Sequence, residues 1–333
     1  MDLLNAFVAI LNYIVIPGAT YGSQLALGAL GITLIFSVLR FSNFAHGDTM
    51  AFGTAFVILF TWGFQALGIS AYPLPTALLG LPFAILVTVA LVLGTDRVVY
   101  RFYRKQKAAS IIMVIVSAGV MFVMNGLVRL IIGTTERNFA DGAKFLLDPK
   151  VFKEFTGLAE PLAIKVTSAV TLGTAVICVG ALFWFLQRTR SGKSMRAFSD
   201  NEDLALLSGI NPDRVVQVTW IIAASLAVIA GTLYGLDKSF RPGIYFGLML
   251  PIFAAAVVGG LGSPIGAIAG GFIVAFAEVF VTYAWKKVAG YVLPADWLGD
   301  GLVQILSTDY KVAVSFSILI IVLLFKPTGL FKR

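Results

Sequence analysis

Apolar runs separated by short polar segments follow one another along almost the whole chain. A helix that crosses a bilayer needs about 20 predominantly apolar residues. Nine runs come close to this length, and most have Gly or Pro near their ends. We expect transmembrane helices at 19–39, 49–67, 75–95, 108–131, 163–187, 215–236, 243–261, 264–285 and 310–325. The pattern predicts an all-α fold, a polytopic membrane helix bundle that forms a single domain over residues 1–333.

A further apolar run at 6–16 is too short to interpret from its length. About 12 apolar residues suit either a tenth span, joined tightly to the next one at Pro17-Gly18, or a helix that lies in the membrane interface. Both interpretations stay open, so the prediction is nine to ten transmembrane helices.

Composition and charge agree with a membrane location. Hydrophobic residues make up 59% of the chain and charged residues 13%, whereas a soluble globular protein has roughly 45–50% and about 25%. Basic loops on the cytoplasmic side explain the net charge of +8, so we expect no nucleic-acid partner. The single cysteine, Cys178, excludes an intramolecular disulfide and a cysteine-rich metal site. No basic residue precedes Arg40, which argues against a cleavable signal peptide, and we expect Met1 to begin the mature chain.

The basic residues also predict the orientation of the chain. Cytoplasmic loops of membrane proteins are rich in Lys and Arg. Two loops are rich in basic residues that few acidic residues accompany, and we expect both in the cytoplasm. The first contains Arg97, Arg101, Arg104, Lys105 and Lys107, and the second contains Arg188, Arg190, Lys193, Arg196 and Arg214. The C-terminus, with Lys326, Lys332 and Arg333, is expected on the same side. The segment 133–162 then faces outward, and its balanced charges, with Asp141 among them, indicate an ordered extracytoplasmic cap.

The cytoplasmic loop 188–214 carries the signals of a short helix at about 199–209. Ser199 and Glu202 form a capping box, and Gly209 suits the left-handed position that ends a helix. The helix dipole favours the negative charges of Asp200, Glu202 and Asp203 in the first turn. The apolar residues Leu204, Leu207 and Ile210 give the helix an apolar side. Such a helix either lies on the membrane or docks into a partner's groove. The acidic first turn favours the partner, because it repels lipid head groups.

Polar residues between the first two long spans form a second candidate region. His46 is the only histidine and follows Asn43 and Phe44 in a break between apolar runs. A lone histidine has no second His or Cys to complete a metal site, so we expect no metal. Either Asn43 and His46 satisfy backbone groups at the break, or they line a transport path.

Glu278 is the clearest acidic residue inside an apolar run. A carboxylate in the bilayer by default marks a functional or a paired position. No cation lies near it in the sequence, so a partner must come from another helix. A structural ion pair and a path-lining carboxylate both stay open.

Small residues recur at helical spacing in the second half of the chain. Membrane helices pack closely where small side chains meet, so these positions predict tight packing inside the subunit, with a subunit interface as the alternative. The positions are Ala223, Ala227, Gly231 and Gly235, then Gly262, Gly266 and Gly270. Pro251 is expected either to kink its span or to break it beside a cavity.

No sequence pattern predicts an enzyme. Arg190-Ser-Gly-Lys-Ser194 matches the end of a phosphate-binding loop, but Gln187 stands where that loop requires Gly and an apolar span precedes it. Paired carboxylates, metal ligands and a nucleophile with its base are all missing from the pattern, so an intramembrane enzyme is the weakest hypothesis. We therefore expect no catalytic residues and no cofactor on this chain.

Four motifs, in this order and among these spans, resemble those of a known family. They are Asn43-Phe-Ala-His-Gly47 with the preceding Tyr21, Ala26 and Gly28; Gly192, Arg196-Ala197 and Ala205 to Gly209-Ile210; Val258 to Gly271; and Lys326-Pro-Thr-Gly-Leu330. The chain resembles the H-type permease subunit of bacterial branched-chain amino acid ABC importers over nearly its whole length. Lys326 replaces the Arg of many relatives, and either cation suits a cytoplasmic membrane edge.

The resemblance implies a multi-pass protein of the bacterial inner membrane that works by alternating access. It implies that the helix at 199–209 is the coupling helix, which seats in a groove of an ATPase subunit. The implied partners are a second, homologous permease, two ATPases that bind ATP and Mg²⁺, a periplasmic substrate-binding protein and membrane lipid. Leucine, isoleucine and valine are the expected substrates, although relatives also move other amino acids, amides or urea. The alternative is an ion-coupled secondary transporter, which would use Glu278 and Pro251 and need no ATPase.

Overall fold

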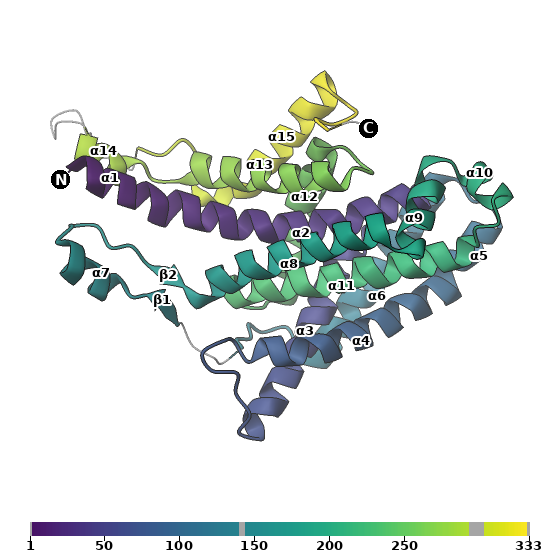
Figure 1. The fold of residues 1–333 in the computed structure, drawn as a ribbon, viewed down its shortest axis with the longest axis horizontal. Helices are drawn as coiled ribbons and strands as arrows, with labels where there is room; N and C mark the ends of the chain where they lie inside the picture. Colours follow the sequence, from purple (N-terminus) through teal and green to yellow (C-terminus); the bar gives the residue numbers. More distant parts are fainter. Residues whose placement is uncertain (1, 140–143, 293–302, 332–333) are drawn as a thin grey trace.

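The computed structural model describes residues 2–139, 144–292 and 303–331 (Figure 1). Within this part of the chain, nine helices are long and apolar enough to cross a membrane. The prediction of a polytopic helical bundle is therefore confirmed. The nine spans are Asp2–Leu39, His46–Ala66, Ala77–Lys105, Ser110–Ile132, Val166–Arg188, Pro212–Lys238, Pro242–Gly259, Pro264–Thr282 and Thr308–Phe325.

The short apolar run at 6–16 is part of the first span. Helix α1 (Asp2–Ile10), a π-helical turn (Leu11–Val15) and α2 (Ile16–Leu39) form one continuous rod. The run is thus neither a separate tenth span nor a separate interfacial helix. Pro17 does not interrupt the rod, because local π-helical adjustments let a membrane helix continue past a residue without an amide hydrogen.

Helix α2 lies at the centre of the bundle. It packs against α8 (Val166–Arg188), α11 (Pro212–Lys238), α12 (Pro242–Gly259) and α13 (Pro264–Thr282), as Figure 1 shows. Helices α3 (His46–Ala66), α4 (Ala77–Thr95) and α6 (Ser110–Ile132) complete one side, and α15 (Lys311–Phe325) packs on α12 and α13. Most side chains of α2 are buried, as expected for a helix at the centre of the bundle.

Glycines allow several of these helices to approach backbone to backbone. A Cβ at Gly266 would lie 2.1 Å from the Gly259 carbonyl oxygen, and a Cβ at Gly270 would lie 2.0 Å from that of Ala255. Gly231 packs in the same way on the Met50 backbone, whereas Gly235 packs on the side chain of Tyr245. Gly262 differs from the prediction: it lies in the turn before α13 with φ +92 and nothing near its Cβ position, so it is a turn residue and not a packing residue. The helical spacing of small residues wrongly included Gly262 in the helix, because α13 begins only at Pro264.

Helix α12 runs through Pro251 without a break. The expectation of a helix broken there beside a cavity is therefore wrong. Pro251 is buried against neighbouring helices, which support the bent or weakened turn that a proline leaves.

One end of the bundle carries a small cap. It contains β1 (Phe145–Leu147), α7 (Pro149–Thr156), β2 (Ile164–Lys165) and, from the far part of the chain, α14 (Lys286–Val292). Glu160 of this cap accepts a hydrogen bond from Tyr291 at 2.7 Å and forms an ion pair with Lys287 at 2.8 Å. The Asn5 side chain accepts from the amides of Ala159 and Glu160. The Glu160 contacts thus hold α14 to the rest of the cap, and Asn5 attaches the cap to α1. Asp141 lies outside the described residues.

The opposite end gathers the basic loops. Helix α4 continues through a π-helical turn (Asp96–Tyr100) into α5 (Arg101–Lys105), which lies near α9 (Arg190–Asp200) and α10 (Glu202–Leu207) in Figure 1. The C-terminal segment meets the same end, because Leu330 donates its amide to Val258 at 2.8 Å, and Gly329 packs on Gly260. Lys332 and Arg333 lie outside the described residues.

Candidate functional site

The loop at 188–214 folds as two short helices, and this corrects the predicted start of the single helix. Ser199 and Asp200 belong to the last turn of α9, so the predicted capping box is wrong. Asn201, in extended conformation, caps α10 instead by accepting a hydrogen bond from the Leu204 amide at 3.0 Å. Asn and Ser are almost equally good N-cap residues, and the sequence pattern alone does not choose between them.

The end of α10 has the predicted glycine geometry. Gly209 adopts φ +77, and the following amide of Ile210 donates to the Ala205 carbonyl at 3.1 Å. Nothing lies within 4 Å of a Cβ built on Gly209, so the backbone conformation alone requires glycine there. Asn211 then caps α11 by accepting from the Arg214 amide, and Pro212 is the first residue of that helix.

The α10 helix presents an unpartnered apolar side. Leu204 is 61% exposed and Leu207 is 85% exposed, whereas Ala205 is buried against the bundle. Glu202 and Asp203 lie in the first turn, where the helix dipole favours negative charge. Exposed leucines on one side of a short helix mark a surface that suits either a partner protein or the membrane interface.

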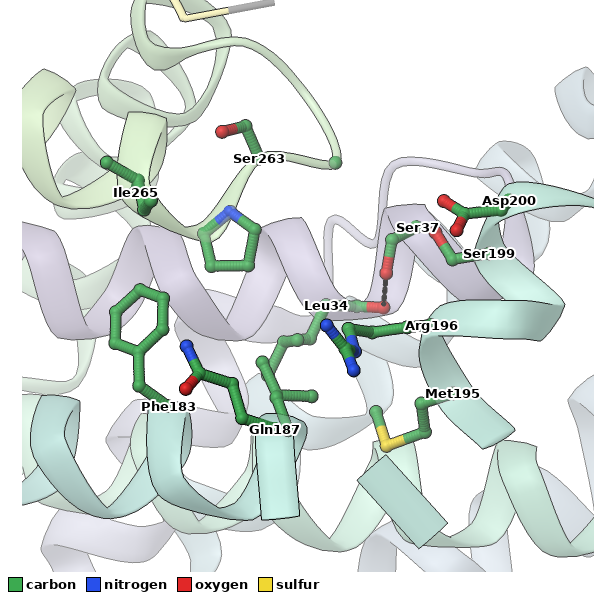
Figure 2. Close-up of a pocket in the computed structure, with 13 residues that line it drawn as sticks. Leu34, Ser37, Phe183, Gln187, Met195, Arg196, Ser199, Asp200, Ser263 and Ile265 are labelled. Atoms are coloured by element: carbon green, nitrogen blue, oxygen red, sulfur yellow. Dashed lines mark hydrogen bonds between the residues drawn. The ribbon is translucent and has the colours of Figure 1, made fainter. Parts of the chain in front are cut away.

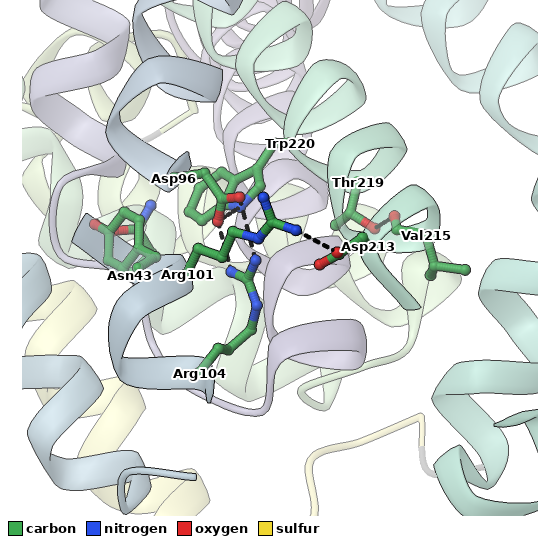
Figure 3. Close-up of polar contacts among 9 residues, drawn as sticks. Asn43, Asp96, Arg101, Arg104, Asp213, Val215, Thr219 and Trp220 are labelled. Atoms are coloured by element: carbon green, nitrogen blue, oxygen red, sulfur yellow. Dashed lines mark hydrogen bonds and ion pairs between the residues drawn. The ribbon is translucent and has the colours of Figure 1, made fainter. Parts of the chain in front are cut away.

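A polar network attaches this region to the first basic loop (Figure 3). Asp96 accepts two hydrogen bonds from Arg104, at 2.5 and 3.2 Å, and one from the Trp220 indole at 2.8 Å. Arg101 pairs with Asp213, in the first turn of α11, at 2.7 Å. Since only four residues separate α10 from α11, these contacts fix the base of α10 to the end of α4 that continues into α5.

The network reaches the chain break between α2 and α3. Tyr100 stacks on Trp220 with ring centroids 5.2 Å apart and donates its hydroxyl to the Asn43 side chain at 3.2 Å. The same Asn43 oxygen accepts from the Ala45 amide at 3.2 Å. Asn43 therefore serves the irregular backbone at the break and is buried.

His46 and Phe44 take different positions at this break. The His46 ring is buried against Gly31, and its Nε2 has no partner among the described residues. Phe44 is partly exposed, and its ring lies 5.2 Å from that of Phe253. No group of three or more metal-ligating side chains lies together in the described part of the chain.

Glu278 has the partner from another helix that the sequence required. Lys311, at the start of α15, pairs with it at 3.6 Å and lies over the Tyr21 ring at 3.9 Å. Ser315 donates a hydrogen bond to the other carboxylate oxygen. The sequence analysis missed Lys311, although it is the charged residue that opens the last apolar run. This geometry is that of a buried structural pair joining α13, α15 and α2.

Comparison with known proteins places the chain among transport permeases. The family profile described as "Branched-chain amino acid transport system / permease component" matches residues 14–323. The high-affinity branched-chain amino acid transport system permease protein LivH of Salmonella typhimurium is 31% identical over 321 residues, which cover 95% of this chain and 94% of LivH. BraD of Pseudomonas aeruginosa, described in the same words, is 30% identical over 319 residues, covering 96% and 94%. A probable LivH of Methanocaldococcus jannaschii is 26% identical over 316 residues, covering 93% and 89%.

These matches extend over nearly all of the spans seen in the structure. The profile begins within the first rod and ends within α15. With nine apolar helices in its described part, the chain is a multi-pass membrane protein. It belongs to the family of branched-chain amino acid transport permease components, as an H-type permease subunit.

Proposed function

We propose that this chain is one permease subunit of an ATP-driven importer for branched-chain amino acids in the bacterial inner membrane. The observation that carries the proposal is α10, a capped helix whose Leu204 and Leu207 are exposed at the end of the bundle that bears the basic loops. The excess of Lys and Arg in these loops supports a cytoplasmic location for that end and for the C-terminus.

The α10 helix supplies a surface for an ATPase subunit. A short amphipathic helix binds a groove through its apolar side, and Leu204 and Leu207 form that side here, with Glu202 at its start and Gly209 at its end. The other residues that the sequence predicted for ATPase coupling do not all belong to this surface. Ala205 and Ile210 face the bundle, and Arg196, Ala197, Ser199 and Asp200 lie on α9. ATP and Mg²⁺ belong to the ATPase chains in this proposal.

Movement of α10 passes directly into the bundle. Asn211 joins α10 to α11, and the Arg101–Asp213 and Asp96–Trp220 contacts join α11 to the end of α4. Asn43 extends the contact to the break between α2 and α3. Closure of the ATPases would therefore displace the helices around the central α2, as alternating access requires.

The remaining partners follow from the names of the relatives and from the family. We propose a second, homologous permease beside this chain, two ATPases below it and a periplasmic binding protein that delivers substrate from outside. The relatives' names support branched-chain amino acids as substrates. The binding protein, more than this chain, would select among them.

Affinity purification of the tagged chain from its native membrane in mild detergent tests this proposal. The expected result is co-purification of a second permease and of ATPases that bind ATP. A Leu204→Asp/Leu207→Asp variant should lose the ATPases and keep the second permease, because only the α10 surface changes. Recovery of the chain alone, from both the parent and the variant, would contradict the proposal.

An ion-coupled secondary transporter remains the second candidate, because Glu278 is a buried carboxylate in a span. Its pairing with Lys311 and Ser315 argues for a structural role. A secondary transporter would accumulate substrate without ATPases and would lose this ability in Glu278→Gln.

A further inference from the structure

A cavity of about 120 Å³ lies between the cytoplasmic ends of α2 and α8, the helix α9 and the start of α13 (Figure 2). None of the contacts described above uses it. Its lining divides into two parts, one polar and one apolar. The polar part includes Gln187, Arg196, Ser199, Asp200 and Ser263, and the apolar part includes Leu34, Phe183, Leu186 and Ile265.

The polar part contains a guanidinium without a counter-charge. Arg196 makes no hydrogen bond or ion pair within the described residues, and its Nε is shielded from solvent. Figure 2 shows its side chain directed toward Leu34 and Gln187, with the Asp200 carboxylate apart from it. Arg196 is half-buried, an arginine remains charged at all physiological pH values, and a partly desolvated charge is stabilised by a paired anion. The cavity therefore favours an anion.

A second feature of the lining also carries positive charge, the N-terminus of α13. Helix α13 begins at Pro264 and points its N-terminus at the cavity, with the Ser263 hydroxyl accepting from the Gly266 amide at 3.2 Å. The N-terminal end of a helix carries partial positive charge. The Ser263 hydroxyl keeps its own hydrogen to donate, so Arg196 and Ser263 offer donors from two different helices.

The apolar part of the lining indicates what kind of anion fits. Phe183 lies one helical turn before Gln187, on the membrane side of it, and Ile265 is 60% exposed. A ligand that fills the cavity thus meets donors at the cytoplasmic level and an exposed apolar surface at the membrane level. Basic pockets between helices on the cytoplasmic side of a membrane bind phospholipid head groups.

We propose that this cavity binds one anionic phospholipid of the inner leaflet. Arg196 holds the phosphate through two parallel hydrogen bonds, the geometry that suits a guanidinium, and the acyl chains lie against Phe183 and Ile265. The proposal rests on the proposed function only in assigning this end to the cytoplasmic leaflet. Because α9 leads into α10, the bound lipid fixes the position of the helix that precedes the coupling surface.

Binding of phosphatidylglycerol to the purified, delipidated full chain tests the proposal. The variants are Arg196→Gln, which removes the charge, and Lys193→Gln, a matched control at an exposed position of the same helix that lies outside the cavity. Native mass spectrometry should show one retained phosphatidylglycerol on the parent chain and on Lys193→Gln, with about tenfold weaker binding to Arg196→Gln, as expected for the loss of a charged hydrogen-bond donor. Equal binding by all three chains would overturn the proposal.

A third variant keeps the proposal testable if Arg196→Gln fails to fold. Ile265→Trp fills the apolar part of the cavity and leaves the charge of α9 intact, so it should also displace the lipid. Inorganic phosphate is the other probe. If phosphate binds to the parent chain and phosphatidylglycerol does not, the lipid assignment is overturned. Lipid binding is measured without ATPases, so its failure and the failure of ATP-driven transport are separate results.

Discussion

Arg104 and Asp96 form a bidentate ion pair, 2.5 Å at its shorter distance, where α4 passes through a π-helical turn into α5. Asp96 is buried, and it also accepts the Trp220 indole hydrogen. One carboxylate thereby joins the first basic loop to α11, the helix that follows α10. Removing that carboxylate should affect both stability and coupling.

We expect Asp96→Asn to destabilise the protein by about 2 kcal/mol, because hydrogen bonds to charged groups contribute about 1.5–3 kcal/mol each. Trp220→Phe removes one neutral donor and should destabilise it by about 1 kcal/mol. Thermal unfolding in detergent measures both effects. Equal unfolding temperatures for the parent and Asp96→Asn would show that the ion pair contributes nothing.

Variants at Gly209 test the proposed coupling role of α10, because they change the backbone conformation at the end of this helix. Gly209→Val places a β-branched residue at φ +77, where such residues are strongly disfavoured, and should lower ATP-driven uptake while the protein still inserts. Gly209→Asn is the matched control, since Asn adopts this conformation far more readily. Uptake at the parent rate by the Val variant would count against the coupling role of α10.

Gly266 tests the close packing of α12 and α13. A Cβ there would meet the Gly259 backbone, so Gly266→Ala should destabilise the protein by about 1–3 kcal/mol, as overpacking does. Gly119 of α6 has nothing near its Cβ position, and Gly119→Ala should be neutral or stabilise by up to about 1 kcal/mol. Similar unfolding temperatures for the two variants would mean that the helices are not held at this distance.

The environment of Glu160 predicts that the stability of the cap depends on pH. Burial alone would raise its pKa, but hydrogen bonds from Lys287 and Tyr291 outweigh burial and hold the pKa below the usual range of a glutamate. The folded state therefore favours the ionised form, and this stabilisation is complete above the ordinary pKa of glutamate and is lost as the pH falls through the lowered value.

We therefore expect the cap to become more sensitive to an acid-active protease as the pH falls from about 7 to about 3, around the ordinary glutamate pKa. The variant Glu160→Gln should show a smaller change over the same range. If cleavage of both proteins followed the same pH curve, the Glu160 ion pair would not be what attaches the cap.

The spans could be predicted from the sequence because hydrophobicity is a local property. Partners from distant segments could not be predicted, as Glu278 shows: its burial was foreseeable, but Lys311 lies 33 positions away and only the packing of α15 on α13 brings the two together. Ser199 and Asn201 show a local limit, since both are good caps and only the fold selects Asn201. Gly262 and Gly266 follow one pattern, but the start of α13 at Pro264 separates a turn residue from a packing residue.

Uptake into sealed proteoliposomes tests the central claim, that separate ATPases drive this permease, most directly. The chain is reconstituted with its co-purifying permease and ATPases, and leucine uptake from binding protein is measured with and without ATP on the ATPase side. We predict uptake that requires ATP, persists without an ion gradient and is lost in Leu204→Asp/Leu207→Asp. Accumulation of leucine by the chain alone under an ion gradient, without ATP, would contradict the account.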